Sequence, residues 1–595
     1  MSDLTRLLIT ASIMMATACG APEGEAPAAA DQMSPAPAEE LHAIADEYLA
    51  ANLRQSPFSV TFAGLGDAVE QDNSAFNDIS PEAGAAFETA EDSLFARINN
   101  IDAAQFESTD WVLYETLREA MEGNVEARIC HQNLWSLNHM FGWQNAFPII
   151  AAAQPVGSNE DRAMALERWA KLPDFLTQDR ANLEDGLSQG FSAPKRVTAR
   201  VIAQLDSLLE RPAAQSPFIG FAATSEDEDF REAAESLVSD QINPAIAAYR
   251  DFLRDEYLPS ARDALSITAL PDGAACYEAM LRSYHTIEIG AEETYRRGRE
   301  TVDANTKTVV ERGQAMFGIT DFSEILRRVK EAPENRFESE GALLEETRAL
   351  IPITKEKITP FFTALPDQEM IVEPYPDYLK GTGQSSRYEQ KPLSEGPATY
   401  RINTDDWRDD TRGGAQIVAV HEGWPGHHLQ ISGSHGLGDQ HPVMKLLRST
   451  AYTEGWARYS EALAEEAGIY ESGFGEITRR AWPARGMVVD PGLHLYGWTN
   501  EQAKSFVRES GRFQSEEAGD NVLDRLAVIP GQLTAYDTGG LEIFALRHEA
   551  EERLGDNFDI RAFHDRVLEN GALPLGALRA HVRAWIAEEE ARSAQ

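Results

Sequence analysis

The segment from His421 to Gln430, HEGWPGHHLQ, restricts the fold of this chain more than any other feature. A histidine followed by a glutamate, with further histidines close by, is one way for a helix to present metal ligands and a general base together. His427 lies six positions after His421. A regular helix would turn it by about 600°, which leaves it about 240° around from His421. The two rings can therefore meet only if the helix is interrupted between them.

Pro425 and Gly426 predict that interruption. Pro425 has no N–H to donate to the carbonyl of His421, and its ring crowds that carbonyl, while Gly426 tolerates unusual backbone dihedrals. We therefore expect a break that brings His427 beside His421 as a ligand. On an unbroken helix His428 would point the same way as His421 but lie about 10 Å further along the axis. We place His428 in the substrate cleft or in the surroundings of the metal.

The simpler alternative is that Pro425 and Gly426 only end a helix, and that the histidines are surface or core residues. The apolar stretch from Gln416 to Val420 argues against it. Such a stretch is buried, so it carries the His-Glu pair into the interior, where unpaired ionisable groups are costly.

A third ligand is expected from a second helix around Glu454. On that helix Glu454, Arg458 and Glu461 share one face. A solvated charged face is the alternative, but it suits Glu465 and Glu466 better than it suits Glu454, which stands between Tyr452 and Trp456. Two histidines and one glutamate make a zinc site with a position open for water. The predicted zinc ligands are His421, His427 and Glu454, and Glu422 is the predicted base that takes a proton from the water on the metal.

Four segments occur in a characteristic order: HEGWPGHHLQ, TEGWARYSE, DPGLHLYGWTNEQA and PGQLTAY. With further matches around Trp169, Gly186–Arg196, Tyr249–Pro259 and Leu270–Gly273 with Tyr277, they resemble the bacterial family known as domain of unknown function 885. That family is similar to zinc peptidases of the gluzincin type. The resemblance implies a mostly α, cleft-containing zinc hydrolase that acts on peptides.

Further site residues are expected after Glu454. Gln532 and Tyr536 lie four apart on one helical face, and a tyrosine hydroxyl there would stabilise the oxyanion opposite zinc. A core tyrosine is the alternative. A histidine between two leucines, like His494, is more often structural, but the family resemblance favours His494 and Arg485 as cleft residues, with Asp490 orienting one of them. The predicted catalytic residues are Glu422, Tyr536 and His494, and the predicted substrate-binding residues are Arg485, Gln532, His428 and Tyr277.

Residues 1–19 have the features of an export signal. Arg6 precedes the apolar run from Leu7 to Ala18, which is short for a bilayer span, and Ala16-Thr17-Ala18-Cys19 resembles a lipobox. An ordinary cleaved signal is the alternative, because Asp3 offsets Arg6. If Cys19 is lipidated, Gly20 favours the outer membrane, so we expect an exported lipoprotein facing the periplasm or the cell surface. Residues 20–38, rich in Ala, Pro and Glu, are predicted to be a flexible tether.

Charge and cysteines limit the partners and the compartment. The formal net charge of −44 argues against nucleic acid or an anionic membrane surface, so we expect membrane contact only through a lipid on Cys19. The same charge would favour cationic substrates. Besides Cys19 the chain has only Cys130 and Cys276. They form either a disulfide, as an oxidising compartment allows, or two buried free thiols.

Residues 39–595 are predicted to form one helical catalytic domain with two lobes that flank a cleft. Apolar residues recur at helical spacing in Lys195–Leu209, Phe230–Tyr257 and Tyr277–Phe317. Between Glu369 and Thr404, short runs rich in Tyr, Thr and Ile indicate a small antiparallel sheet beside the cleft. It would bind a substrate backbone as an added strand, or form a surface flap.

The predicted function is zinc-dependent hydrolysis of peptide bonds in the cell envelope. A zinc esterase or deacylase is the nearer alternative, and an envelope lipoprotein that binds peptides without cleaving them is the other. The intact Glu422 argues against pure binding, because a structural metal site needs no acidic residue beside an open position. Neither the substrate sequence nor the oligomeric state follows from these patterns.

Overall fold

The computed structural model of the protein describes residues 36–594, apart from 67, 70, 224, 377–384, 392–395, 406, 436, 439, 448 and 471. This part of the chain is mostly helical, as predicted, and it contains a single three-stranded sheet within the described ranges. The predicted signal peptide, with Cys19, and the tether up to residue 35 lie outside the described residues. The first helix begins at Pro37, slightly before the predicted domain start at residue 39.

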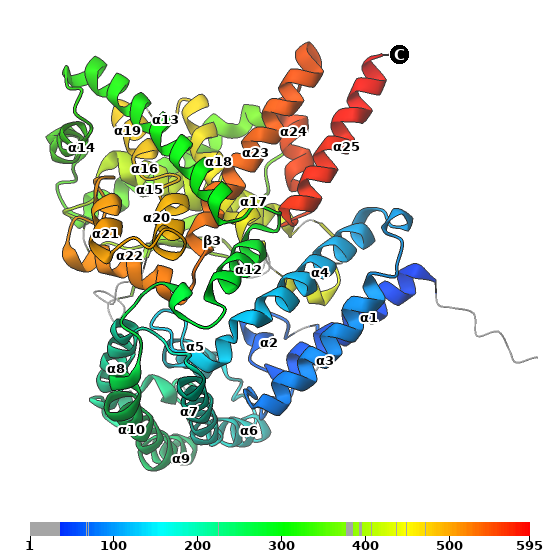
Figure 1. Ribbon diagram of the computed structural model, residues 1–595, viewed down its shortest axis with the longest axis vertical. Helices are drawn as coiled ribbons and strands as arrows, with labels where there is room; N and C mark the ends of the chain where they lie inside the picture. The colour runs from blue at the N-terminus through cyan, green and yellow to red at the C-terminus, as the bar shows by residue number, and fades with distance from the viewer. Residues whose placement is uncertain are drawn as a thin grey trace, which may run out of the picture.

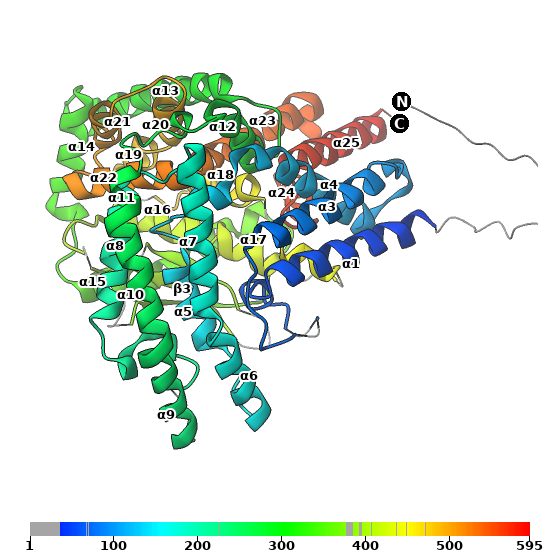
Figure 2. The same cartoon turned by 60° about the horizontal axis from the view of Figure 1, so that its bottom comes forward.

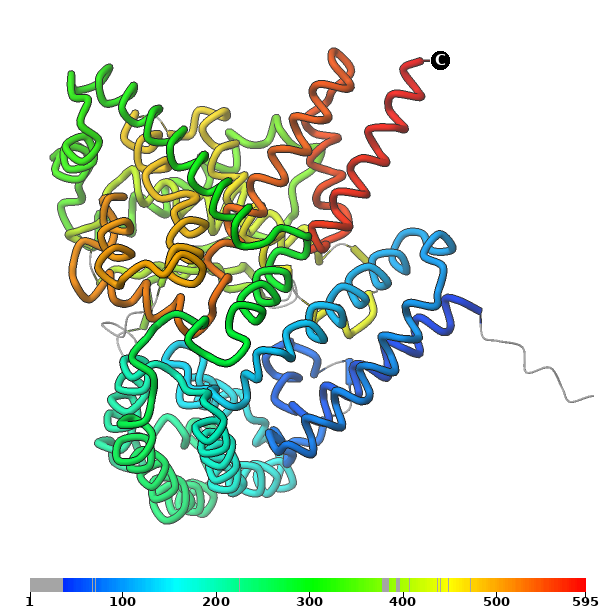
Figure 3. The backbone as a smooth tube through the Cα atoms, in the orientation of Figure 1, coloured from blue at the N-terminus to red at the C-terminus, as the bar shows by residue number. Residues whose placement is uncertain are grey.

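The first helices form a bundle with its own apolar core, in which Leu41 and Leu117 are fully buried. They are α1 (Pro37–Gln55), α2 (Ser59–Phe62), α3 (Pro81–Ile98) and α4 (Ser108–Ala127). In Figure 3 this part of the chain, in blue, forms one arm in the lower half of the view.

The next helices pack around Trp169, which is fully buried in a second core. They are α5 (Trp143–Ala153), α6 (Asn159–Trp169), α7 (Leu172–Gln189), α8 (Lys195–Leu209), α9 (Glu228–Leu237), α10 (Asn243–Phe252) and α11 (Leu258–Ser260). The predicted helix Lys195–Leu209 is confirmed with the same bounds, and the stretch from Phe230 to Tyr257 is helical with two π-helical turns. Helices α6, α7, α9 and α10 extend away from the rest of the molecule (Figure 2).

The remaining helices surround the largest core and a smaller one near α20. They are α12 (Gly273–His285), α13 (Ala291–Phe317), α14 (Phe322–Glu331), α15 (Glu340–Ile358), α16 (Arg412–Glu422), α17 (His427–Ser434), α18 (Thr450–Glu466), α19 (Gly473–Ala481), α20 (Gly486–His494), α21 (Asn500–Arg508), α22 (Glu516–Val528), α23 (Gln532–Leu554), α24 (Ile560–Leu568) and α25 (Leu575–Ser593). The stretch Tyr277–Phe317 is thus divided into α12 and α13. In Figure 1 these helices occupy the upper half, with α12 between them and the first two groups.

Cys130 and Cys276 form a disulfide, which settles the question left open by the sequence. The bond joins the turn that follows α4 to α12, so it lies where the first two groups of helices meet the third.

The sheet differs from its prediction. It consists of β1 (Met370–Pro374), β2 (Arg387–Glu389) and β3 (Ala398–Ile402), in the order β1-β3-β2. β3 pairs antiparallel with β2 but parallel with β1, so the predicted antiparallel sheet is in fact mixed. The chain passes from β1 to β2 and returns to the middle, so β3 runs in the direction of β1. Alternation of side chains within a strand does not carry that information.

Helices α18 and α23 approach each other closely through glycines. A Cβ atom placed on Gly539 of α23 would lie 1.7 Å from the carbonyl oxygen of Ala451 in α18. A Cβ atom on Gly455 would lie 2.4 Å from the carbonyl carbon of Gly539. Only glycine fits at these positions, and the close packing brings Glu454 of α18 near Tyr536 of α23.

Candidate metal centre

The helix that carries His421 is interrupted where the sequence predicts it. α16 ends at Glu422 and α17 begins at His427. A Cβ atom on Gly426 would lie 2.0 Å from the carbonyl oxygen of His421, so the break requires glycine there. The carbonyl of Pro425 accepts a hydrogen bond from the indole N–H of Trp456 at 2.8 Å, which fixes the break against α18.

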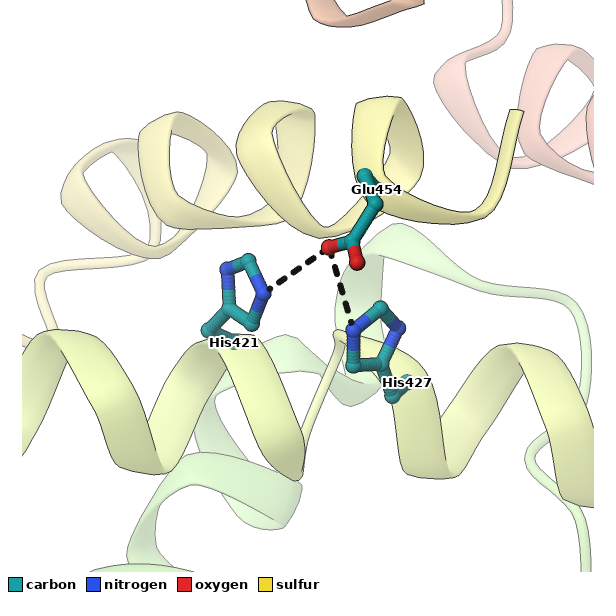
Figure 4. A group of neighbouring side chains, drawn as sticks. All are labelled: His421, His427 and Glu454. Carbon is teal, nitrogen blue, oxygen red and sulfur yellow. Dashed lines mark ion pairs between the residues drawn. The ribbon is translucent and has the colours of Figure 1, made fainter. Parts of the chain in front are cut away.

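The break brings three potential metal ligands together. The Nε2 atoms of His421 and His427 lie 3.4 and 3.6 Å from Oε2 of Glu454, and Figure 4 shows both rings directed at this oxygen. One ligand atom from each of the three residues lies within 4.8 Å of the others. The side chains of His421 and Glu454 remain 13% and 20% exposed, so the group can be reached from solvent.

These three side chains fit a zinc ion. With bonds of about 2.0–2.1 Å at tetrahedral angles, neighbouring ligand atoms are about 3.4 Å apart, close to both measured distances. Oε2 of Glu454 is buried and has no hydrogen-bond partner among the described residues. An unpartnered buried carboxylate oxygen that faces two imidazole nitrogens is the arrangement that a cation would stabilise.

A second carboxylate orients His421. Its Nδ1 lies 2.9 Å from Oε1 of Glu461, and Arg458 donates a hydrogen bond to the same oxygen at 2.8 Å. Arg458 also lies 3.4 Å from Asp537 of α23. A carboxylate on the far nitrogen of a metal-binding histidine fixes its tautomer and raises its basicity. The stripe of Glu454, Arg458 and Glu461 seen in the sequence thus has a distinct role for each member.

The charges of the group favour binding of a cation. Burial alone would lower the pKa of His421, but Glu454 and Glu461 outweigh it and raise that pKa to about 10. Burial alone would raise the pKa of Glu454, but His421 and His427 hold it below its usual range. Without metal the group therefore keeps a proton on His421, which a metal ion has to displace.

Glu422 lies beside the three ligands as a buried acid. Glu422 is only 8% exposed, and burial raises the pKa of its carboxyl above the usual range. Oε2 of Glu422 accepts a hydrogen bond at 2.8 Å from the backbone N–H of Tyr388, in β2. The sheet therefore does lie beside the site, as the sequence indicates, and one of its edges positions the predicted base.

Tyr536 lies on the α23 side of the ligands. Its ring stacks on His421 with the ring centres 6.5 Å apart, and burial raises the pKa of its hydroxyl to about 12. The hydroxyl accepts a hydrogen bond from Arg525 at 3.3 Å, and Arg525 also donates to the side-chain oxygen of Gln532. The predicted pair Gln532 and Tyr536 is thus linked through Arg525, a residue that the sequence analysis did not single out.

His428 lies away from the three ligand atoms. It is fully buried, with Nε2 2.9 Å from the carbonyl oxygen of Gln368 and Nδ1 3.2 Å from the hydroxyl of Tyr388. Burial lowers the pKa of His428 to about 4, so the ring is neutral and can donate to the carbonyl while it accepts from the tyrosine. The position predicted for substrate contact is therefore a buried one, and its partners secure the sheet.

The structure buries His494 and Tyr277, whose rings are in contact, beside the C-terminal half of α20, and it buries Arg485 at the N-terminal end of this helix. The hydrogen bonds of all three lie within the fold, which differs from their predicted place in the cleft. Nδ1 of His494 accepts a hydrogen bond from the N–H of Ile267, and Nε2 lies 3.1 Å from the carbonyl oxygen of Leu526. With both ring nitrogens used by the backbone, His494 has no atom left for catalysis.

Arg485 and Tyr277 also have hydrogen-bond partners within the fold. Arg485 donates to the carbonyls of Ala481 and Phe506. Tyr277 donates to Asp490 at 2.6 Å, so Asp490 orients Tyr277 and not His494 or Arg485. The contacts of Tyr277 and His494 join α12, α20 and α22, and those of Arg485 join the start of α20 to α19 and α21.

The comparisons with known proteins agree with this architecture. A family model described as "Bacterial protein of unknown function (DUF885)" matches residues 57–582. The chain belongs to the DUF885 family. A search of curated proteins found no match.

Two solved structures resemble this DUF885 protein over nearly its whole length. One is the "putative lipoprotein" from Colwellia psychrerythraea, with a TM-score of 0.84 and 24% identity, covering 93% of this chain and all of the other. The second is a "putative lipoprotein of unknown function" from Shewanella oneidensis, with a TM-score of 0.74 and 17% identity, covering 91% of this chain and 99% of the other. At these identities the likeness establishes the fold alone. Within the described ranges, no helix of the DUF885 protein has both the length and the apolarity needed to span a bilayer.

Proposed function

We propose that this DUF885 protein is a zinc-dependent hydrolase that cleaves peptide bonds in the cell envelope. The observation that carries the proposal is the convergence of His421, His427 and Glu454 around one point, with the buried acid Glu422 next to them in sequence and space. Two imidazoles and one carboxylate suit zinc and leave a coordination position free for reaction.

Each residue has a role that its surroundings support. His421, His427 and Glu454 would hold the zinc ion, which would supply a Lewis acid for a substrate carbonyl and would make water more acidic. Glu422, held by the N–H of Tyr388, accepts a proton from the attacking water, and its raised pKa brings it closer to the pH at which a base works best. The hydroxyl of Tyr536 keeps its proton and donates a hydrogen bond to the carbonyl oxygen as negative charge develops there.

We also propose that the protein is exported and anchored by a lipid on Cys19. The lipobox-like sequence supports this, as does the description of both similar solved structures as putative lipoproteins. Wild-type protein from cells should partition into detergent, and Cys19→Ser should lose the anchor. A mature wild-type terminus without lipid, cleaved at a different position, would contradict this part of the proposal.

The decisive experiment is incubation of the purified, zinc-loaded mature protein with a mixed peptide library, with fragments identified by mass spectrometry. New fragments that disappear on chelation and return with zinc would support peptidase activity. Parallel samples of acylated amines and simple esters test the deacylase and esterase alternatives. An intact peptide library after incubation with protein that holds one zinc per chain would overturn the proposal.

A further inference from the structure

Arg525 is placed beside the metal centre by α22. Its guanidinium lies over the ring of Tyr536, 5.7 Å from the ring centre, and its Nη2 donates to the hydroxyl of the same tyrosine. Because Tyr536 also stacks on His421, one side chain separates this cation from a zinc ligand. The guanidinium and the three ligands are therefore close enough to contact the same short peptide.

Arg525 has no carboxylate partner in the part of the chain that the structure describes. Its hydrogen bonds go to the neutral oxygens of Gln532 and Tyr536, and its Nε is buried without a partner. The adjacent carboxylate of Asp524 is bound instead by Arg196 and Arg200. A partly buried arginine without a carboxylate partner keeps an unused capacity for charged hydrogen bonds, and leaving it unpaired costs free energy.

Asp490 of α20 attracts Arg525 electrostatically but forms no hydrogen bond or ion pair with it in the described part of the chain. Asp490 is fully buried and accepts hydrogen bonds from Tyr277 and from the N–H of Gly531 instead. Arg458, whose guanidinium is also 5.7 Å from the ring centre of Tyr536, faces Glu461 and Asp537. Arg458 and Arg525 thus differ, since Arg458 faces two carboxylates and Arg525 is hydrogen-bonded only to neutral oxygens among the described residues.

We infer that Arg525 binds a carboxylate of the substrate, so that the hydrolase proposed above acts on peptides with a negative charge close to the scissile bond. This inference rests on the proposed function. A guanidinium matches a carboxylate with parallel N–H bonds, and a charge-assisted pair of this kind is stronger than a neutral hydrogen bond. The carboxylate is either the C-terminal α-carboxylate or the side chain of Asp or Glu. Either would reverse the preference for cationic substrates that the net charge suggests.

The test separates binding from cleavage. Four pools of random hexapeptides are prepared, with the C-terminus free or amidated and with Asp and Glu present or replaced by Asn and Gln. Zinc-loaded Glu422→Gln protein is equilibrated with each pool, and the bound peptides are measured by mass spectrometry after ultrafiltration. The measurement is repeated on Glu422→Gln proteins that also carry Arg525→Met, Arg525→Gln or Arg525→Lys. A protein with Arg583→Met instead is the control, because Arg583 is an exposed arginine of α25. Circular dichroism and zinc content identify the variants that are folded.

We expect carboxylate-bearing peptides to bind about 10- to 100-fold more tightly than their neutral counterparts, which is the range for a charged hydrogen-bonded pair. Arg525→Met and Arg525→Gln should lose this preference, Arg525→Lys should restore part of it, and Arg583→Met should keep it. Sensitivity to amidation identifies the C-terminal carboxylate, and sensitivity to the Asp and Glu replacement identifies the side chain. If Arg525 had only a structural role, its replacement would change the stability of the protein but not this binding preference.

Two results would overturn the inference: equal binding of charged and neutral pools, or a preference that persists in the folded Arg525→Met protein. Cleavage by the protein with intact Glu422 is measured on the same pools. Carboxylate-selective binding without cleavage would contradict the proposed function and leave the role of Arg525 supported. Cleavage without any carboxylate preference would support the proposed function and contradict the role of Arg525.

Discussion

Two buried, histidine-containing clusters lie in the same half of the molecule, and they differ in whether their hydrogen-bonding capacity is used. In the cluster around α20, both ring nitrogens of His494 are occupied by backbone groups. In the candidate metal centre, Oε2 of Glu454 is buried without a hydrogen-bond partner among the described residues, and it faces the Nε2 atoms of His421 and His427. Burial of a histidine therefore does not mark a functional site in this protein. The candidate metal centre is distinguished instead by potential ligand atoms that face one point.

The largest expected effect is on zinc content, and it compares the replacement of two adjacent histidines. His427→Ala should abolish stoichiometric zinc, because it removes one of three ligands. His428→Ala should retain zinc, because its ring contacts Gln368 and Tyr388 instead. Metal analysis of folded variants with matching circular dichroism measures both. The opposite order of zinc contents would mean that the break in the helix does not select the ligand.

The second test concerns turnover. Glu422→Gln should keep one zinc per chain while the rate of peptide cleavage falls about 10²- to 10⁴-fold, the usual contribution of a general base. The amide preserves the shape of the side chain and can still accept the N–H of Tyr388. Steady-state kinetics on a cleaved peptide, with zinc content measured on the same sample, provides the comparison. Unchanged turnover would remove Glu422 from the mechanism.

The third test concerns how the stability of the fold depends on pH through Asp490 in the cluster around α20. Burial raises the pKa of Asp490 to about 7, so the folded protein holds a proton that the unfolded chain releases above its ordinary pKa of about 4. The contribution of Asp490 to the free energy of unfolding is therefore fully present below about pH 4. It decreases as the pH rises from about 4 to about 7, by up to about 4 kcal/mol in total.

Urea denaturation at several pH values measures this effect. The difference in unfolding free energy between wild type and Asp490→Asn should change across pH 4–7, and zinc content should be the same in both proteins. A pH-independent difference would show that Asp490 is ionised throughout this range.

The smallest expected effect concerns the partner of His421. Glu461→Gln should lower zinc affinity about 10- to 100-fold, because the carboxylate that orients the ring and raises its basicity is lost. Glu465→Gln on the same helix is the matched control, since Glu465 pairs with Arg479 and Arg480. Competition with a chelator of known affinity gives both values. Equal losses in the two variants would assign the effect to α18 as a whole.

The sequence predicted those features of the site that depend on local backbone chemistry. The break between His421 and His427 follows from the missing N–H of Pro425 and from the small size of Gly426, both of which are properties of the residues themselves. Glu454 stood out because a carboxylate between two aromatic residues needs a partner. The helical content and the bounds of α8 followed from periodicity in the same way.

What the sequence could not predict depends on contacts between distant segments. His494 looks the same in sequence whether its nitrogens face a substrate or the backbone of residues 267 and 526. Arg525 has no motif around it, and its importance arises only because Asp524 is turned toward Arg196 and Arg200. The parallel pairing of β1 with β3 likewise depends on the path of the chain, which the pattern of a single strand does not encode.

The bond between Cys130 and Cys276, which are 146 positions apart, makes a covalent ring of the chain from α5 to α11. A protease that cuts once within this ring would not separate the molecule, because the two fragments stay linked through sulfur. Nicked protein would therefore run as one band on a non-reducing gel and as two after reduction. The ring is joined at a single covalent point to the part of the chain with the proposed zinc ligands, so it can be cleaved without breaking the covalent connection between α4 and α12.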